Sequence, residues 1–181
     1  MDSEFMQTVA ALVSARGIRV LRFEFPYMKQ RRQTGKKRPP DRMPALLAAF
    51  AEAVEEAGGP SACVVGGKSM GGRVASMLLA QSSVQGAVSL GYPFHPPGKP
   101  DKVRREHWSD ITAPWLIVQG TRDPFGKPDE VAGYELPSTS ELRWLDDGDH
   151  DFKPRKASGL SQSQHWQQAA DWVSDFILGV A

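Results

Sequence analysis

Residues 62–72 read Ala-Cys-Val-Val-Gly-Gly-Lys-Ser-Met-Gly-Gly, a short apolar run followed by a glycine-rich turn around Ser69. Within it, residues 67–71 fit the pattern Gly-x-Ser-x-Gly, and a helical pattern of apolar residues follows. A serine between a strand and a helix sits in a sharp turn that pushes its hydroxyl out of the sheet. Glycines flank it because the two backbones approach too closely for side chains. The stretch therefore predicts a nucleophilic Ser69 in an α/β fold.

Short apolar runs alternate with helical patterns along the rest of the chain. Such alternation is typical of a mostly parallel sheet covered by helices on both faces. We therefore expect one α/β domain over residues 1–181, a three-layer sandwich without a lid domain. About five strands are expected, at residues 18–25, 62–65, 87–90, 115–118 and 142–145.

The composition limits the class of protein. A chain of 181 residues suits a single domain, and 22 Lys and Arg against 21 Asp and Glu give a formal net charge of +1. This balance argues against a histone-like basic protein, and 40% hydrophobic residues argue against disorder. The sequence shows neither a membrane-length apolar run nor a signal peptide, and its one cysteine, Cys63, allows no internal disulfide. We expect a cytoplasmic globular protein with no membrane partner.

A catalytic serine also needs a base and an acid that orients the base. In this architecture both come later in the chain, in the order Ser, Asp or Glu, His, from loops that follow strands. Asp123 closely follows the expected strand at 115–118, and His150 follows the one at 142–145. Each residue alone fits a structural role, as a helix cap, a turn residue and a surface histidine. Because all three fall where the mechanism requires them, we predict a triad of Ser69, Asp123 and His150.

Aromatic residues that follow strand ends are candidates for the rim of a substrate pocket. We predict substrate contacts from four of them, and His95 is a further residue that could line the pocket. No Cys and His residues have metal-ligand spacing, so we expect neither a metal nor a cofactor. The four aromatic candidates are Tyr27, Tyr92, Phe94 and Phe125.

Two stretches offer rival functions. Gly67-Lys68-Ser69 matches the end of a phosphate-binding loop, but that motif needs a glycine where this chain has Ala62, and a loop where it has a strand. The basic residues within 29–38 could attract phosphate or an acidic partner. They lack the interleaved aromatic residues that stack on bases. We therefore favour a solvated connection and expect no nucleic-acid binding.

Several segments resemble the α/β-hydrolase superfamily, namely residues 67–73, 120–126 and 147–152. With residues 22–27 and 91–97, they are more narrowly similar to a bacterial branch related to dienelactone hydrolases and to the testis-expressed and NSL-complex hydrolase-like proteins. The resemblance spans essentially the whole chain. It implies Ser69 as nucleophile, His150 as base and Asp123 as acid. Dienelactone hydrolases themselves use a cysteine nucleophile, which is absent here.

The chain departs from this family at its N-terminal side. In the family, the helix that matches residues 2–16 follows a strand and a His-Gly-rich loop, which supplies one N–H of the oxyanion hole. The other N–H comes from the residue after the nucleophile, here Met70. The resemblance thus implies an N-terminally short fold, with a strand missing between those expected at 18–25 and 62–65. Either the chain is a truncated version of a longer protein, or those two strands pair directly and the site is rebuilt.

From these observations we expect a serine hydrolase that cleaves a small carboxylic ester or thioester through an acyl-enzyme. Because losing one oxyanion donor typically costs about 10²–10³ in turnover, we expect the chain to be weakly active or inactive. The alternative is a non-catalytic, hydrolase-like interaction module. An unpaired sheet edge would also favour a homodimer.

Overall fold

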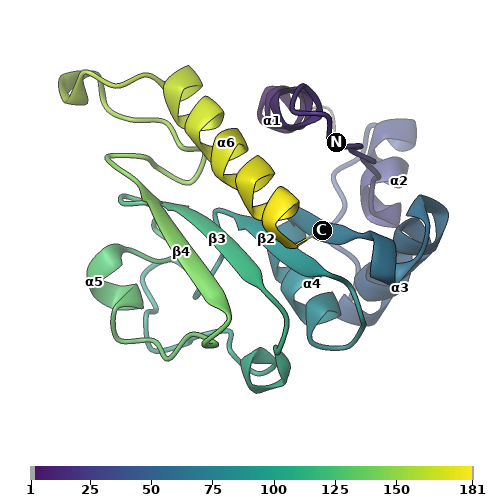
Figure 1. Cartoon of the computed structure of the whole chain (residues 1–181). Coiled ribbons are helices and arrows are strands. Elements are labelled where there is room, and N and C mark those ends of the chain that lie inside the picture. The colour runs from purple at the N-terminus through teal and green to yellow at the C-terminus, as the bar shows by residue number, and fades with distance from the viewer. Residues whose placement is uncertain (1–2, 181) are drawn as a thin grey trace.

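The structure is a computed structural model that describes residues 3–180. Four parallel strands form one sheet in the order β1-β2-β3-β4. Figure 1 shows β2, β3 and β4 side by side. Because the register aligns Lys68 with Leu90 and Leu90 with Val118, the carboxyl ends of the first three strands lie together at one edge. The strands are β1 (Val64–Lys68), β2 (Gly86–Leu90), β3 (Trp115–Gly120) and β4 (Ser140–Leu145).

Helices cover both faces of this sheet, which confirms the expected three-layer α/β fold. Helices α1 (Glu4–Ser14) and α6 (Gln162–Val180) pack together on one face, and their buried residues join a cluster with Val88, Leu116 and Val118. Helices α3 (Met43–Ala57) and α4 (Met70–Leu79) cover the other face. All residues of β2 and β3 are buried, as expected for central strands of such a sheet.

The apolar periodicity explains why α1 lies on the sheet. Phe5, Val9 and Val13 recur every fourth residue and are the buried residues of this helix. The Oγ atom of Ser3 accepts a hydrogen bond from the backbone N–H of Met6 at 3.4 Å, which caps the first turn. The face that α1 buries therefore follows directly from the spacing of its apolar residues.

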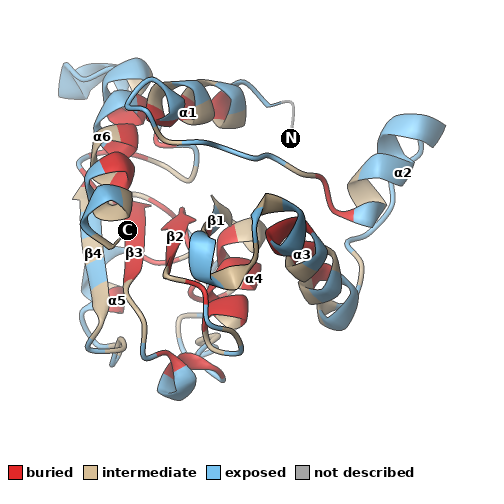
Figure 2. Cartoon of the chain, turned by 45° about the vertical axis from the view of Figure 1, so that its right-hand side comes forward, coloured by how far each residue is buried: buried red, intermediate tan, exposed pale blue. Residues whose placement is uncertain are grey.

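The expected strand at residues 18–25 is wrong. This segment leads from α1 to α2 (Pro26–Thr34) outside the sheet (Figure 2), exposed at residues 19–22 and buried at Glu24 and Phe25. Val20 and Leu21 are 38% and 43% exposed, although the segment partly alternates between apolar and charged residues as a strand does. The physical reason is that a strand needs a neighbour for its N–H and C=O groups, and β1 pairs with β2 alone among the described residues. Direct pairing of this segment with β1 is therefore not observed.

The basic stretch is exposed, as a solvated connection would be. Helix α2 buries no residue and stands away from the sheet (Figure 2), and residues 29–40 are all exposed. The helix was not expected from the sequence. It ends at Gly35, whose φ of 67° is left-handed. A contact between Arg32 and Glu24 at 2.8 Å ties α2 to the preceding segment.

Candidate active site

Ser69 occupies a strained turn between β1 and α4. Its φ of 53° and ψ of −117° are rarely adopted by a residue with a side chain, and such strain is typical of functional sites. A Cβ at Gly67 would lie 2.6 Å from the backbone carbon of Gly71, so the turn closes only with glycine. Ser69 donates its backbone N–H to the carbonyl of Leu90 at 2.9 Å, which fixes the turn to the end of β2. The local geometry is the strand-turn-helix arrangement that the sequence predicts.

Asp123 and His150 are brought together by the fold. Nδ1 of His150 lies 2.8 Å from Oδ2 of Asp123, and the Asp123 carboxylate is fully buried. The other carboxylate oxygen, Oδ1, accepts the backbone N–H of Phe125 at 2.9 Å. Because both oxygens are engaged, the carboxylate holds the imidazole in one orientation. In this arrangement Nδ1 of His150 carries the proton and donates it to Asp123, which leaves Nε2 of His150 free to accept a proton.

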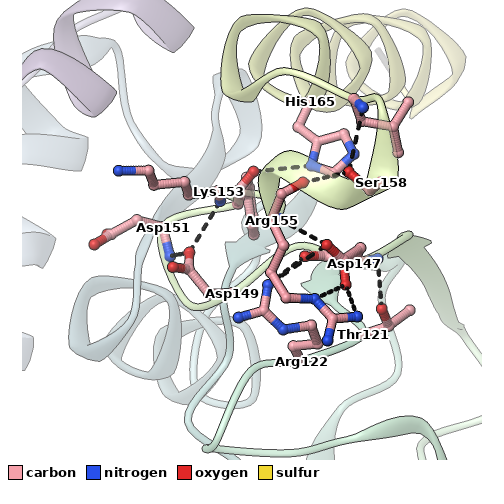
Figure 3. Close-up of polar contacts among 11 residues, drawn as sticks. Thr121, Arg122, Asp147, Asp149, Asp151, Lys153, Arg155, Ser158 and His165 are labelled. Carbon is pink, nitrogen blue, oxygen red and sulfur yellow. Dashed lines mark hydrogen bonds and ion pairs between the residues drawn. The ribbon is translucent and has the colours of Figure 1, made fainter.

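The loop at residues 147–153, which we call the base loop, is fastened to the turn after β3. The N–H of Asp147 donates to Oγ1 of Thr121 at 2.8 Å, and Arg122 donates to the carbonyl oxygen of Asp147 at 2.9 Å. The Asp147 carboxylate in turn accepts the backbone N–H and the Nε of Arg155, both at 2.7 Å (Figure 3). Hydrogen bonding to Arg155 holds the pKa of Asp147 below its usual value. The acid and the base therefore sit on two loops that are held as one unit.

The base loop crosses the sheet from β4 toward β1. At the end of β3, a Cβ on Gly120 would overlap the carbonyl oxygen of Gly148, so only glycine lets the loop pass. At the end of β2, a Cβ on Gly91 would lie 3.2 Å from Nδ1 of His150. His150 thus lies against the residue that follows Leu90, and Leu90 in turn accepts the Ser69 N–H. The backbone of Ser69 and the ring of His150 therefore lie beside the same short segment, residues 90–91.

The side chain of Ser69 is not hydrogen-bonded to His150 within the described part of the chain. Catalytic hydrogen bonds are often long before substrate binds and tighten in the bound complex. Met70 is the first residue of α4, and N–H groups in the first turn of a helix have no acceptor within that helix. Its N–H is thus of the kind that can bind an oxyanion. The positive end of the α4 dipole lies at the same point.

The four aromatic candidates divide into core and surface residues. Tyr92 and Phe94 are fully buried in the cluster beneath the sheet, so neither has surface for a substrate, contrary to our expectation. The reason is that their rings pack against Trp108 and Trp115 in this cluster. Phe125 is half-buried and its ring centroid lies 4.6 Å from that of His150. Tyr27 lies on α2 and packs on Phe25, without a described contact to the Ser69, Asp123 or His150 side chains.

The other histidines are structural. His95 is buried, with Nε2 3.2 Å from Glu130 and Nδ1 2.8 Å from the carbonyl of Pro96, and so does not line a pocket. His165 is buried on α6, with Nδ1 2.8 Å from the carbonyl of Phe152. Burial, and then the charge of Arg73, lower the pKa of His107 to about 4.

Two further side chains of the site were missed from the sequence. Nζ of Lys68 lies 2.7 Å from Oδ1 of Asp151, which joins the residue before Ser69 to the residue after His150.

Over residues 3–180, there is no group of three or more His, Cys, Asp or Glu side chains that could hold a metal ion. No helix in the same range is long and apolar enough to span a membrane.

A family model described as an alpha/beta hydrolase domain matches residues 1–178. A structure of an Agrobacterium tumefaciens protein of unknown function, a candidate α/β hydrolase, is similar over 99% of this chain and 79% of its own, with 19% identity and a TM-score of 0.72. The esterase domain of a Rhodothermus marinus protein is similar over 95% of this chain and 79% of its own, with 14% identity and a TM-score of 0.66.

An α/β serine hydrolase homologue from Coxiella burnetii is similar over 97% of this chain and 76% of its own, with 16% identity and a TM-score of 0.64. At these identities the likeness concerns the fold. No curated protein matches.

Proposed function

The chain belongs to the alpha/beta hydrolase family, and from that premise we propose that it is a serine hydrolase of carboxylic esters or thioesters. The observation that carries this proposal is the 2.8 Å contact between His150 Nδ1 and the fully buried carboxylate of Asp123. A buried carboxylate that orients an imidazole beside a strained serine turn is the arrangement that nucleophilic serine catalysis needs.

In the proposed reaction, Nε2 of His150 removes the proton from Oγ of Ser69 as that oxygen attacks the substrate carbonyl carbon. The resulting oxyanion accepts the N–H of Met70 at the start of α4. His150 then gives its proton to the departing alcohol or thiol, which leaves an acyl group on Ser69. A water molecule, deprotonated by the same imidazole, attacks the acyl carbon; His150 then returns this proton to Oγ of Ser69 as the bond to the acyl carbon breaks and the acid leaves. Asp123 stabilises the imidazolium at both steps.

The N–H of Met70, in the first turn of α4, supports the proposal as one donor to the oxyanion. Removal of one oxyanion donor typically lowers turnover by about 10²–10³. We expect rapid covalent modification of Ser69, because the contact between His150 and Asp123 favours an activated serine.

The test combines a fluorophosphonate probe with p-nitrophenyl acetate hydrolysis, each measured on the wild type and on Ser69→Ala. We expect labelling of the wild type at Ser69, ester turnover, and loss of both in the variant. Turnover that persists unchanged in Ser69→Ala would contradict the assignment of the nucleophile. A folded wild type that is neither labelled nor active would favour the alternative, a non-catalytic interaction module.

A further inference from the structure

Lys68 and Asp151 flank the two groups that must exchange a proton. Lys68 directly precedes Ser69, and Asp151 directly follows His150. Their side chains meet with Nζ 2.7 Å from Oδ1. The pair therefore joins the serine turn, which starts at the end of β1, to the base loop, which arrives from β4 on the opposite side of the sheet.

The ammonium group of Lys68 is shielded from solvent. Its side chain is 17% exposed, and Nζ lies 5.3 Å from the centroid of the Phe5 ring on α1. Phe5 is fixed in turn by edge contacts with Phe152 and Trp166, at centroid distances of 5.3 and 5.7 Å. A cation between an aromatic face and a carboxylate is attracted by both and has little freedom to leave. The Asp151 side chain is 66% exposed, so the contact is shielded from solvent on the lysine side and open to it on the carboxylate side.

The backbone of Asp151 is held separately. Its carbonyl oxygen accepts Nε2 of Gln162 at 3.0 Å and Nε1 of Trp166 at 3.2 Å, both from α6. Its N–H donates to Oδ1 of Asp149 at 2.9 Å, which also accepts the N–H of Lys153. Figure 3 shows how the Asp149 carboxylate turns into the loop. Helix α6 thus fixes the base loop from one side, and the contact with Lys68 links the loop directly to the serine turn.

The imidazole of His150 has two acidic residues near it, Asp123 and Asp151. The Asp123 carboxylate contacts Nδ1, the Phe125 ring lies against the imidazole, and uncharged Gly91 lies beneath it. Asp151 is a second acid near this ring. The hydrogen bond from Lys68 and the charge of Lys68 lower the pKa of Asp151, and His150 makes a smaller contribution in the same direction. Asp151 is therefore ionised, and Lys68 compensates its charge.

We propose that Lys68 is a positioning residue, which fixes the base loop against the serine turn and balances the charge of Asp151 beside His150. This role rests on the proposed function, because the two groups that Lys68 would align are Ser69 and His150, the proposed nucleophile and base. Without Lys68, the Asp151 carboxylate would stabilise the imidazolium, so that His150 would stay protonated to higher pH. The loop would also lose its link to the turn, and Ser69 would react more slowly.

The first experiment is independent of catalysis. The ring resonances of His150 are followed by NMR against pH, and assigned with His150→Gln, in the wild type, Lys68→Met, Lys68→Arg and Asp151→Asn. Methionine keeps the apolar stem of Lys68 without the charge. We expect the titration midpoint of His150 to rise in Lys68→Met, because the Asp151 carboxylate then faces the imidazole without a compensating charge. The midpoint should return toward the wild-type value in Lys68→Arg, and the rise should be absent from Asp151→Asn.

The second experiment measures fluorophosphonate labelling of Ser69 on the same variants, at a pH well above the midpoint of each. Lys68→Met and Asp151→Asn should each slow labelling roughly tenfold, and the double variant should be no slower than either single variant, because both remove one contact. With an ester substrate, kcat should fall while KM stays unchanged. The matched control is Lys153→Met, which removes an exposed lysine from the same loop.

The outcomes separate this inference from the proposed function. An unmoved midpoint in Lys68→Met, or an equal rise in Lys153→Met, would overturn the charge-balancing role even if Ser69 is labelled. Wild-type labelling that is unchanged in both single variants would overturn the positioning role. Failure of the wild type to label would instead contradict the proposed function, and the NMR titration would still decide the role of Lys68. If Lys68→Met does not fold, Asp151→Asn tests the same contact from its other side.

Discussion

Protonation of His107 should destabilise the helix that carries the serine turn. His107 is 6% exposed, and its Nε2 lies 2.8 Å from Oγ of Ser76, which itself donates to the carbonyl of Arg73 within α4. The hydroxyl therefore accepts from Nε2, so the neutral ring carries its proton there. The other ring nitrogen, Nδ1, is buried without a hydrogen-bond partner. A second proton would create an unpaired buried N–H beside the positive charge of Arg73.

The size of this effect follows from the pKa of His107, which burial and Arg73 lower from 6.5 to about 4. Above pH 6.5 the ring is neutral in both the folded and the unfolded chain, and its contribution to stability is fully present. As the pH falls from 6.5 to 4, the unfolded chain binds a proton and the folded chain does not. The free energy of unfolding then falls by about 1.4 kcal/mol per pH unit, or about 3 kcal/mol in total.

The assay is urea unfolding at pH 7.5, 6.5, 5.5 and 4.5 on the wild type and on His107→Gln, whose amide can still donate to Ser76. Carboxylates that titrate in the same range contribute to both proteins and cancel in the difference between their free energies of unfolding. We expect this difference to shift by about 3 kcal/mol in favour of the variant as the pH falls. A difference that stays flat from pH 7.5 to 4.5 would refute the reasoning.

Two predictions concern the site directly. Asp123→Asn should keep the fold but reduce Ser69 labelling and ester turnover by roughly 10⁴, because the amide favours the wrong imidazole tautomer; an equal loss in the exposed control Asp129→Asn would contradict this. Gly120→Ala should destabilise the protein by about 1–3 kcal/mol in urea unfolding and slow labelling, because its Cβ would push the base loop away from β3. Gly179→Ala, where an added Cβ meets nothing within 4 Å, should do neither.

The serine turn could be predicted from the sequence because its causes are local. The Gly-x-Ser-x-Gly pattern, the apolar run before it and the helix after it all lie within a few residues of Ser69. Asp123 and His150 could be found because each follows an apolar strand, and parallel strands present their carboxyl ends at one edge. The structure confirms the fold and brings the carboxylate and the imidazole together.

What could not be predicted depends on partners that are distant in the sequence. Residues 18–25 have the alternation of a strand, but a strand forms only where another strand lies beside it. Tyr92 and Phe94 follow a strand end as rim residues do, yet the path of the chain after β2 takes them into the core. The contact between Lys68 and Asp151 depends on the base loop crossing the whole sheet, which no local pattern encodes.

The crossing of the base loop makes the sheet itself part of the proposed catalytic geometry. Ser69 follows β1 and His150 follows β4, the two outer strands of the described sheet. The distance between Ser69 and His150 therefore depends on the spacing between neighbouring strands and on the twist of the sheet. Repacking of apolar residues far below the site, such as Trp115 or Leu116, could alter that twist by a few degrees. Laboratory evolution of this protein for faster turnover would then select changes in the buried interior as readily as changes around the reacting groups.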